Sequence, residues 1–143
     1  MVAKVWLITG CSTGFGREIA LAALEHGDSV VVTARRLEAV SDICDRYPHQ
    51  TLAAALDVTD PVQIDAVLNS AIEHFGGIDV LVNNAGYGYV GAIEEGEEEA
   101  VRQLFETNFF GALALTKAVL PQMRERGSGH IINNSSQAGL MSN

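Results

Sequence analysis

The most constraining feature of this 143-residue chain is a glycine-rich stretch that follows an apolar run near the N-terminus. The run Val5–Ile8 (VWLI) predicts a buried strand, and Thr9–Gly16 (TGCSTGFG) places three glycines between that strand and a predicted helix. Glycines permit a sharp turn and a close approach of phosphate, and a helix N-terminus offers free N–H groups and a positive dipole end. The stretch therefore predicts either a pyrophosphate-binding loop or an ordinary glycine-rich turn.

Strand-like and helix-like patterns alternate along the whole chain. The expected strands are Val5–Thr9, Ser29–Ala34, Leu52–Leu56, Val80–Val82 and His130–Ser135. A capping-box pattern marks one helix start between them, with Asp60 as the N-cap, Pro61 at the first helical position and Gln63 two residues later. The alternation predicts a single α/β domain, in which a parallel sheet carries helices on both faces.

The longest helical pattern runs from about residue 97 to about residue 126. One stripe of this helix consists of Val101, Leu104, Phe105, Asn108, Ala112, Leu115 and Val119. Asn108 is the polar member of the stripe, and a buried polar side chain without a partner costs about 1–3 kcal/mol. The stripe predicts that Asn108 either takes part in a site or hydrogen-bonds to the backbone as a structural residue.

Charge and cysteine content restrict the classes of function. A formal net charge of −9 argues against binding to nucleic acid or to an anionic membrane. The acidic residues between Glu94 and Glu99 fit a solvated loop and a first helical turn better than a metal site, so we expect no metal. Cys11 and Cys44 have no metal or redox spacing, which predicts a reducing compartment, the cytoplasm. We recognise no signal peptide, and the apolar stretch 109–120 is too short to span a bilayer.

Polar or glycine residues follow every predicted strand. They are the glycine-rich stretch, Arg35-Arg36, Asp57-Val58, Asn83–Gly86 and Ser135-Ser136. In open parallel sheets, ligands bind beyond the carboxyl ends of the strands, so we expect these residues to share one rim. Such residues at every strand end predict a ligand-binding site at this rim and argue against a purely structural edge.

The two arginines after the second strand indicate which dinucleotide fits. A carboxylate usually stands there to bind the ribose hydroxyl of NAD, whereas guanidinium groups hold a 2′-phosphate through charge-assisted bonds. Arg35 and Arg36 therefore predict NADP(H), with a preference of roughly tenfold or more, because each such bond contributes about 1.5–3 kcal/mol. The alternative is that the arginines cap the strand and solvate the start of the next helix.

Taken together, these motifs resemble the short-chain dehydrogenase/reductase family. The residues that match in order and spacing are Thr9–Gly16, Asp57, Asn83–Gly86, Asn108 and Asn133–Ser136. The resemblance covers the whole chain and implies a Rossmann-type, doubly wound parallel sheet of about five strands. It also implies an NADP cofactor, hydride transfer between nicotinamide and a small-molecule carbonyl or alcohol substrate, and assembly into homo-oligomers.

The resemblance assigns a role to each matching residue. It implies Gly10, Ser12, Gly14, Phe15 and Gly16 for the phosphates and adenosine ribose, Arg35 and Arg36 for the 2′-phosphate, Asp57 and Val58 for adenine, and Asn84, Ala85 and Gly86 for the ribose and nicotinamide. Two positions match catalytic residues: Ser136 would hydrogen-bond the substrate oxygen, and Asn108 would support a proton-relay water. Asn134 stands at a strand position where the family usually has an apolar residue, so we expect it to need a hydrogen-bond partner.

The family's proton donor is a tyrosine in a Tyr-x-x-x-Lys motif, about a dozen positions past Ser136, and this chain ends at Asn143. We therefore expect residues 1–143 to form an NAD(P)-binding domain that is incomplete at its C-terminus and inactive alone. The apolar helical segment at 109–120 would lack cover, which predicts that the chain alone is poorly soluble, self-associating or only partly folded. Three other hypotheses stay open: a non-catalytic dinucleotide-binding module, a nonfunctional fragment, and a flavodoxin-like or receiver-type binding domain.

Overall fold

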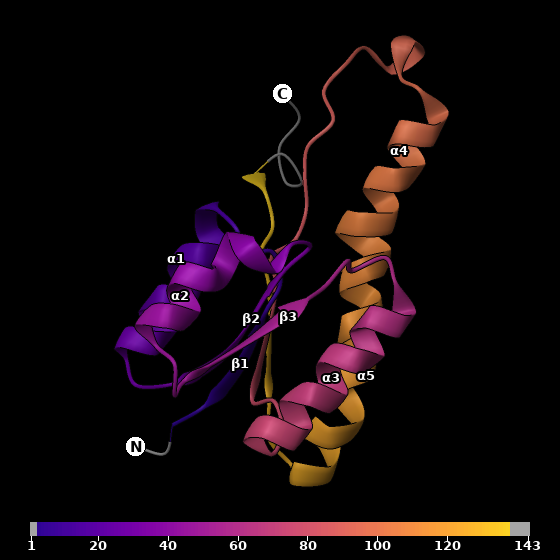
Figure 1. The fold of residues 1–143 in the computed structure, drawn as a ribbon. Helices are drawn as coiled ribbons and strands as arrows, with labels where there is room; N and C mark the ends of the chain where they lie inside the picture. The colour runs from indigo at the N-terminus through magenta and orange to yellow at the C-terminus, as the bar shows by residue number, and fades with distance from the viewer. Residues whose placement is uncertain (1–2, 138–143) are drawn as a thin grey trace.

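Five short strands, rich in apolar and β-branched residues, form one parallel sheet. The computed structural model describes residues 3–137, and within them the strands pair in the order β3-β2-β1-β4-β5 (Figure 1). Their bounds are β1 (Val5–Ile8), β2 (Ser29–Ala34), β3 (Thr51–Ala55), β4 (Val80–Asn83) and β5 (His130–Asn133). The predicted α/β class, the doubly wound sheet and the strand positions are confirmed, with strand ends that shift by a residue or two.

Helices cover both faces of the sheet. On one face lie α1 (Gly14–Glu25) and α2 (Ser41–Arg46), which follows a 3₁₀ turn at Leu37–Val40. On the other face lie α3 (Pro61–Phe75) and α5 (Ala112–Arg126) (Figure 1). No helix within residues 3–137 is long and apolar enough to cross a membrane.

Successive residues of the central strands feed two separate apolar cores. Leu7 and Leu81 belong to the core beneath α3 and α5, whereas Ile8 and Val82 belong to the core beneath α1 and α2, and all four are fully buried. This burial on both faces explains the continuous apolar runs in the sequence. The chain proceeds outward from β1 to β3, and α3 then returns it to β4 on the other side of β1. The strand order therefore reverses between β1 and β4, the place where such sheets bind ligands.

The start of α3 is capped as predicted, but Gln63 acts differently from a capping-box residue. The Asp60 carboxylate accepts hydrogen bonds from the Val62 N–H (2.9 Å) and the Gln63 N–H (3.4 Å), and Pro61 occupies the first turn. The Gln63 side chain does not return to the Asp60 N–H. Its Oε1 accepts from the Asp57 N–H (2.8 Å), while its Nε2 donates to the Asp60 carboxylate (2.9 Å). Gln63 thereby ties the helix start to the residue at the end of β3.

The helix expected over about 97–126 contains a π-helical turn that the sequence does not reveal. An α-helical segment, α4 (Glu98–Phe105), leads into the wide turn Glu106–Gly111, and α5 follows without a break. At Gly111 a Cβ atom would lie only 2.6 Å from Val58 Cγ2. The absence of a side chain at Gly111 therefore lets the helix pass directly over the loop that follows β3.

A buried carboxylate, that of Asp28, fixes the N-terminal end of β1. Asp28 Oδ1 accepts a hydrogen bond from the Lys4 N–H (2.8 Å), and Oδ2 accepts one from Trp6 Nε1–H (3.0 Å). The ring of His26 also lies close, with Nδ1 3.3 Å from Oδ2. Burial alone would raise the pKa of Asp28, but the hydrogen bonds from Lys4, Trp6 and His26 outweigh it and lower the pKa below its ordinary value.

Replacing Asp28 with asparagine should lower the free energy of unfolding by about 1–3 kcal/mol near neutral pH, because an amide N–H would then face one of these donors. A depressed pKa contributes stability above the unfolded-state value, and that contribution is lost as pH falls through the folded value. Urea unfolding of the complete protein should therefore show the difference between Asp28→Asn and the unmodified protein shrinking below about pH 4.

Asp65→Asn, at an exposed position on α3, is the matched control. An equal loss in both variants, or a loss in Asp28→Asn that does not vary with pH, would contradict the assignment.

Candidate functional site

A cavity of about 1120 Å³ lies at the carboxyl ends of the strands. Its walls come from the loops after β1 to β5 and from α4 with its π-helical turn, far apart in the sequence. The lining residues are Gly10, Ser12, Thr13, Phe15, Ala34, Arg35, Leu56, Asp57, Val58, Thr59, Asn84, Ala85, Gly86, Tyr87, Gln103, Glu106, Thr107 and Asn134. The residues predicted to bind a cofactor all line this cavity except Gly14, Gly16 and Arg36.

The hydroxyl of Thr9 joins the glycine-rich loop to the loop after β4. The Thr9 side chain is buried, and Oγ1 accepts hydrogen bonds from the Asn84 N–H (2.9 Å) and the Ala85 N–H (2.8 Å). The same hydroxyl donates to the Val82 carbonyl (3.3 Å). Sequence reasoning treated Thr9 as the end of a strand and missed this role; the signal available was a hydroxyl side chain directly before the first glycine.

At Gly16, where the loop meets α1, there is no space for a side chain. A Cβ atom at Gly16 would lie 2.3 Å from Asn84 Nδ2 and 2.4 Å from the Gly10 carbonyl oxygen. Both distances are far shorter than a van der Waals contact. Gly16 therefore does not touch the cavity itself but allows α1 to pack against the loops that form the cavity wall.

The first turn of α1 faces the cavity without a capping side chain. Its N-cap residue, Thr13, is extended and makes no capping hydrogen bond through its side chain, and the first turn carries no acidic residue. Thr13 and Phe15 line the cavity, and the Phe15 ring is 74% exposed beside it. Uncapped N–H groups at the positive end of a helix dipole can accept a phosphate or another anion.

Cys11 anchors the same loop to the strands beneath it. Its N–H donates to the Thr33 carbonyl (2.8 Å), and its thiol donates to the Ile8 carbonyl (3.2 Å). The side chain is fully buried, and this burial raises the pKa of the thiol to about 12. Such a thiol is not nucleophilic at physiological pH, so Cys11 has a structural role.

Opposite charges line the part of the cavity beyond β2 and β3. Arg35 lines the cavity directly, whereas its neighbour Arg36 does not. The Asp57 carboxylate accepts hydrogen bonds from the Thr59 hydroxyl (2.7 Å) and the Thr59 N–H (3.0 Å). These bonds, together with the charge of Arg35, lower the pKa of Asp57 and keep it ionised. This region can therefore receive both an anionic group and a hydrogen-bond donor.

The side chain of Asn108 is held by the backbone of Tyr87, in the loop after β4. Its Nδ2 donates to the Tyr87 carbonyl (2.7 Å), and its Oδ1 accepts from the Tyr87 N–H (3.1 Å). These contacts agree with the alternative in which Asn108 is a structural residue, because both the oxygen and the nitrogen of its amide bond to backbone. The expected burial of Asn108 is wrong. Its stripe is buried at Leu115 and Val119, but α4 and the π-helical turn extend past the sheet and leave Asn108 and Phe105 exposed (Figure 1).

The segment after β5 brings one predicted residue to the cavity and leaves another at its margin. Asn134 was expected within a strand but lies one residue beyond β5, where its Nδ2 donates to Asn84 Oδ1 (2.9 Å). The partner that Asn134 was expected to need is thus Asn84. Ser136 is exposed in the same segment and does not line the cavity. Its predicted catalytic role stays a prediction.

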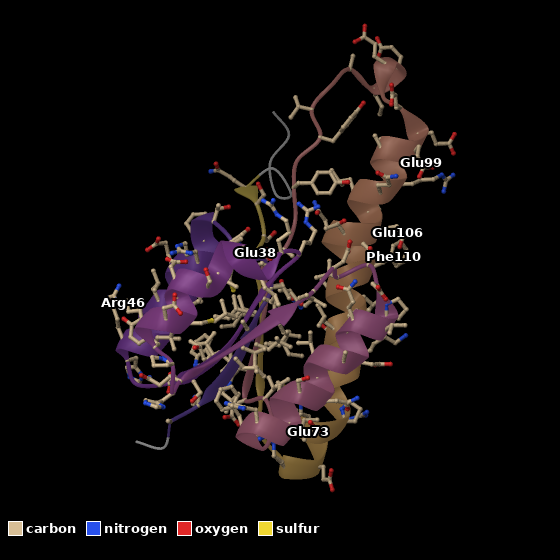
Figure 2. All side chains as sticks on the ribbon, in the orientation of Figure 1. Glu38, Arg46, Glu73, Glu99, Glu106 and Phe110 are labelled. Carbon is tan, nitrogen blue, oxygen red and sulfur yellow. The ribbon has the colours of Figure 1, made fainter. Side chains whose placement is uncertain are left out.

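Three cavity residues had no signal in the sequence. Gln103, Glu106 and Thr107 reach the cavity from α4 and the π-helical turn. Figure 2 shows Glu106 on this helix, between Glu99 and Phe110. Their placement depends on the course of the helix over the loop after β3, which the local pattern of residues does not determine.

Comparison with known proteins assigns this fold and cleft to a family. The family model described as short chain dehydrogenase matches residues 4–143. The chain therefore belongs to the short-chain dehydrogenase family, and the resemblance seen in the sequence is confirmed.

Individual relatives agree with this assignment. Oxidoreductase BOA17 from Botryotinia fuckeliana (strain B05.10) is 42% identical over 137 residues, which cover 95% of this chain and 50% of the relative. The crystal structure of a short-chain dehydrogenase from Streptomyces avermitilis is 54% identical with a TM-score of 0.95, covering 99% of this chain and 52% of that chain. ElxO with NADP bound is 33% identical with a TM-score of 0.92, covering 99% of this chain and 59% of that chain. The chain thus spans between half and three fifths of the length of these proteins.

Substitution of Gly16 by alanine should destabilise the protein by about 1–3 kcal/mol, because the new methyl group must displace the Asn84 amide or the Gly10 carbonyl. Urea unfolding of the complete protein measures this loss. The control is Gly91→Ala, since a Cβ at Gly91 would meet nothing closer than 3.9 Å. Equal stability of the two variants would show that the loop does not require close contact at Gly16.

Proposed function

We propose that the complete protein is an NADP(H)-dependent oxidoreductase, and that residues 3–137 form most of its dinucleotide site. The observation that carries the proposal is the cavity at the strand ends, where an uncapped helix N-terminus, a glycine-rich loop and Arg35 meet. Membership of the short-chain dehydrogenase family and the NADP held by ElxO support the same cofactor.

The residues that line the cavity suit the separate parts of NADP(H). The diphosphate would lie against Gly10, Ser12 and the first turn of α1, where N–H groups are available. Arg35 would bind the 2′-phosphate through charge-assisted hydrogen bonds, and the ionised Asp57 would accept a bond from the adenine amino group. The loop Asn84–Gly86 would border the ribose and nicotinamide. Gly14, Gly16 and Arg36 would contribute through loop shape and charge.

The cofactor, when bound, supplies a hydride to a carbonyl carbon or accepts one from an alcohol carbon. Ser136 would hydrogen-bond the substrate oxygen and so hold the reacting carbon in place. Asn108 would keep the wall formed by Tyr87 at a fixed distance through its two backbone hydrogen bonds. By resemblance to the family, the proton would come from a tyrosine in a Tyr-x-x-x-Lys motif, which we expect in the sequence beyond Asn143.

A non-catalytic dinucleotide-binding module is the second candidate, because the cavity residues alone account for binding. The two candidates differ in one measurement. If the complete protein is an enzyme, NADPH absorbance falls when a panel of small ketones and aldehydes is added, and Ser136→Ala slows the turnover without loss of NADPH binding. Binding of NADPH with no turnover of any carbonyl substrate would favour the module.

The charge at position 35 should decide between NADPH and NADH. We expect the complete protein to bind NADPH roughly tenfold or more tightly than NADH, and Arg35→Asp to remove or reverse this preference, because a carboxylate repels the 2′-phosphate. Fluorescence titration with both cofactors measures the two dissociation constants. Arg124→Asp, an exposed position on α5, makes the same charge change as a control. Tighter binding of NADH by the unmodified protein would overturn the assignment.

We also propose that the complete protein forms homo-oligomers through a second apolar stripe on α4, the π-helical turn and α5. This stripe overlaps the one through Asn108 only at Val101 and Phe105. The exposed apolar side chains of this stripe are Val101, Phe105, Phe109, Phe110 and Leu113. Their exposed fractions range from 37% to 56%, and exposed apolar side chains that recur along one helical segment are typical of an interface. The rings of Phe109 and Phe110 pack edge to face, with centroids 5.1 Å apart.

Phe109→Ser should weaken the oligomer, because the substitution removes an aromatic side chain from the middle of the stripe. Sedimentation of the complete protein over a range of concentrations should show dissociation at least about tenfold more readily than in the unmodified protein. Val62→Ser is the control, since Val62 is 75% exposed but lies at the start of α3, outside the stripe. An unchanged association constant in Phe109→Ser would place the interface elsewhere.

A further inference from the structure

The side-chain amide of Asn84 lies at the centre of the glycine-rich loop. Its Nδ2 donates to the Thr9 carbonyl (2.9 Å) and to the Gly10 carbonyl (3.2 Å). The same nitrogen occupies the space that a Cβ at Gly16 would need. The loop therefore wraps around this amide group, and the path of the loop depends on the direction in which the amide points.

A second amide favours the same direction. Asn134 Nδ2 donates to Asn84 Oδ1 (2.9 Å), so the oxygen of Asn84 faces β5 and its nitrogen faces the glycine-rich loop. The backbone fixes Asn134 in turn, because its N–H donates to the Asn83 carbonyl (2.9 Å) and continues the β4–β5 pairing one residue beyond the strand. Asn134 also lines the cavity, and Ser136 follows two residues later.

A donor at position 134 and the two carbonyls of the loop favour the same orientation of the Asn84 amide. With a donor there, the observed orientation satisfies the oxygen and leaves both N–H groups for Thr9 and Gly10. An acceptor at the same place would favour the reversed amide, which would put an oxygen against the two carbonyls of the loop. An apolar side chain would leave the orientation to the loop alone.

We propose that Asn134 is a positioning residue of the dinucleotide site: its side-chain N–H fixes the Asn84 amide and, through it, the diphosphate-binding loop. This inference deepens the proposed function and rests on it for the identity of the ligand. Its consequence is that the segment carrying Ser136 and the glycine-rich loop are held in register by one continuous line of hydrogen bonds across β5, β4 and β1.

Two variants of the complete protein test the proposal. Asn134→Asp keeps the shape but replaces the donor with an acceptor, and Asn134→Leu removes hydrogen bonding. Both should bind NADP⁺ about three- to tenfold more weakly than the unmodified protein. Adenosine 2′-monophosphate has no diphosphate and would meet the loop only through its ribose, so it should lose less affinity than NADP⁺ in both variants. Asn69→Asp, at an exposed position on α3, controls for the Asn-to-Asp change.

Hydrogen exchange of residues 9–16 in the ligand-free proteins gives a reading that does not depend on the cofactor. Exchange should be faster in Asn134→Asp and Asn134→Leu and unchanged in Asn69→Asp. Equal weakening of both ligands, or NADP⁺ binding within about twofold together with unchanged exchange, would overturn the proposal. If the unmodified protein binds no NADP⁺, the proposed function fails, and unchanged exchange at residues 9–16 would still overturn the positioning role by itself.

Discussion

The shape of the cleft depends on the hydrogen bonds that the buried hydroxyl of Thr9 makes to a neighbouring loop. Parallel strands end at the same rim, but their last residues have backbone groups that the sheet no longer pairs. At the switch point between β1 and β4, Thr9 Oγ1 accepts hydrogen bonds from two of these groups, the N–H groups of Asn84 and Ala85. One side chain thus joins the two loops that border the centre of the cavity. These hydrogen bonds fix the distance between the two loops. The glycines of one loop and the amide of Asn84 in the other fit together only at this distance.

The sequence predicted those strands and helix starts that depend on interactions between neighbouring residues. Continuous apolar runs identified β2 and β4 because these strands are buried on both faces of the sheet, and Asp60 with Pro61 identified the start of α3 because both act on the nearest turn. The π-helical turn had no such signal. Its last residue, Gly111, lies against Val58, which is far away in the chain. Nor did the sequence show where the stripe through Asn108 leaves the core: Leu115 and Val119 are fully buried, whereas Phe105 is half exposed.

The candidate site could be located from the sequence because the topology of a parallel sheet gathers the strand ends. Arg35, Asp57 and Asn84 were expected at one rim, and the structure places them around one cavity. What the sequence could not provide was the wall supplied by a helix, where Glu106 and Thr107 stand. Nor could it assign the partners of individual amides, because Asn84 and Asn134 meet only after β4 and β5 have paired.

The close contact of Gly111 with Val58 links two positions that are distant in the sequence but share one small volume. A Cβ at Gly111 would overlap the methyl group, the Cβ and the carbonyl oxygen of Val58. The helix and the loop after β3 therefore cannot change independently. Among descendants of this sequence, alanine at 111 should be tolerated only where the loop has moved outward, which would widen the cavity beside Asp57. Substitution of Gly111 would then alter the shape of the cavity, although Gly111 itself does not line it.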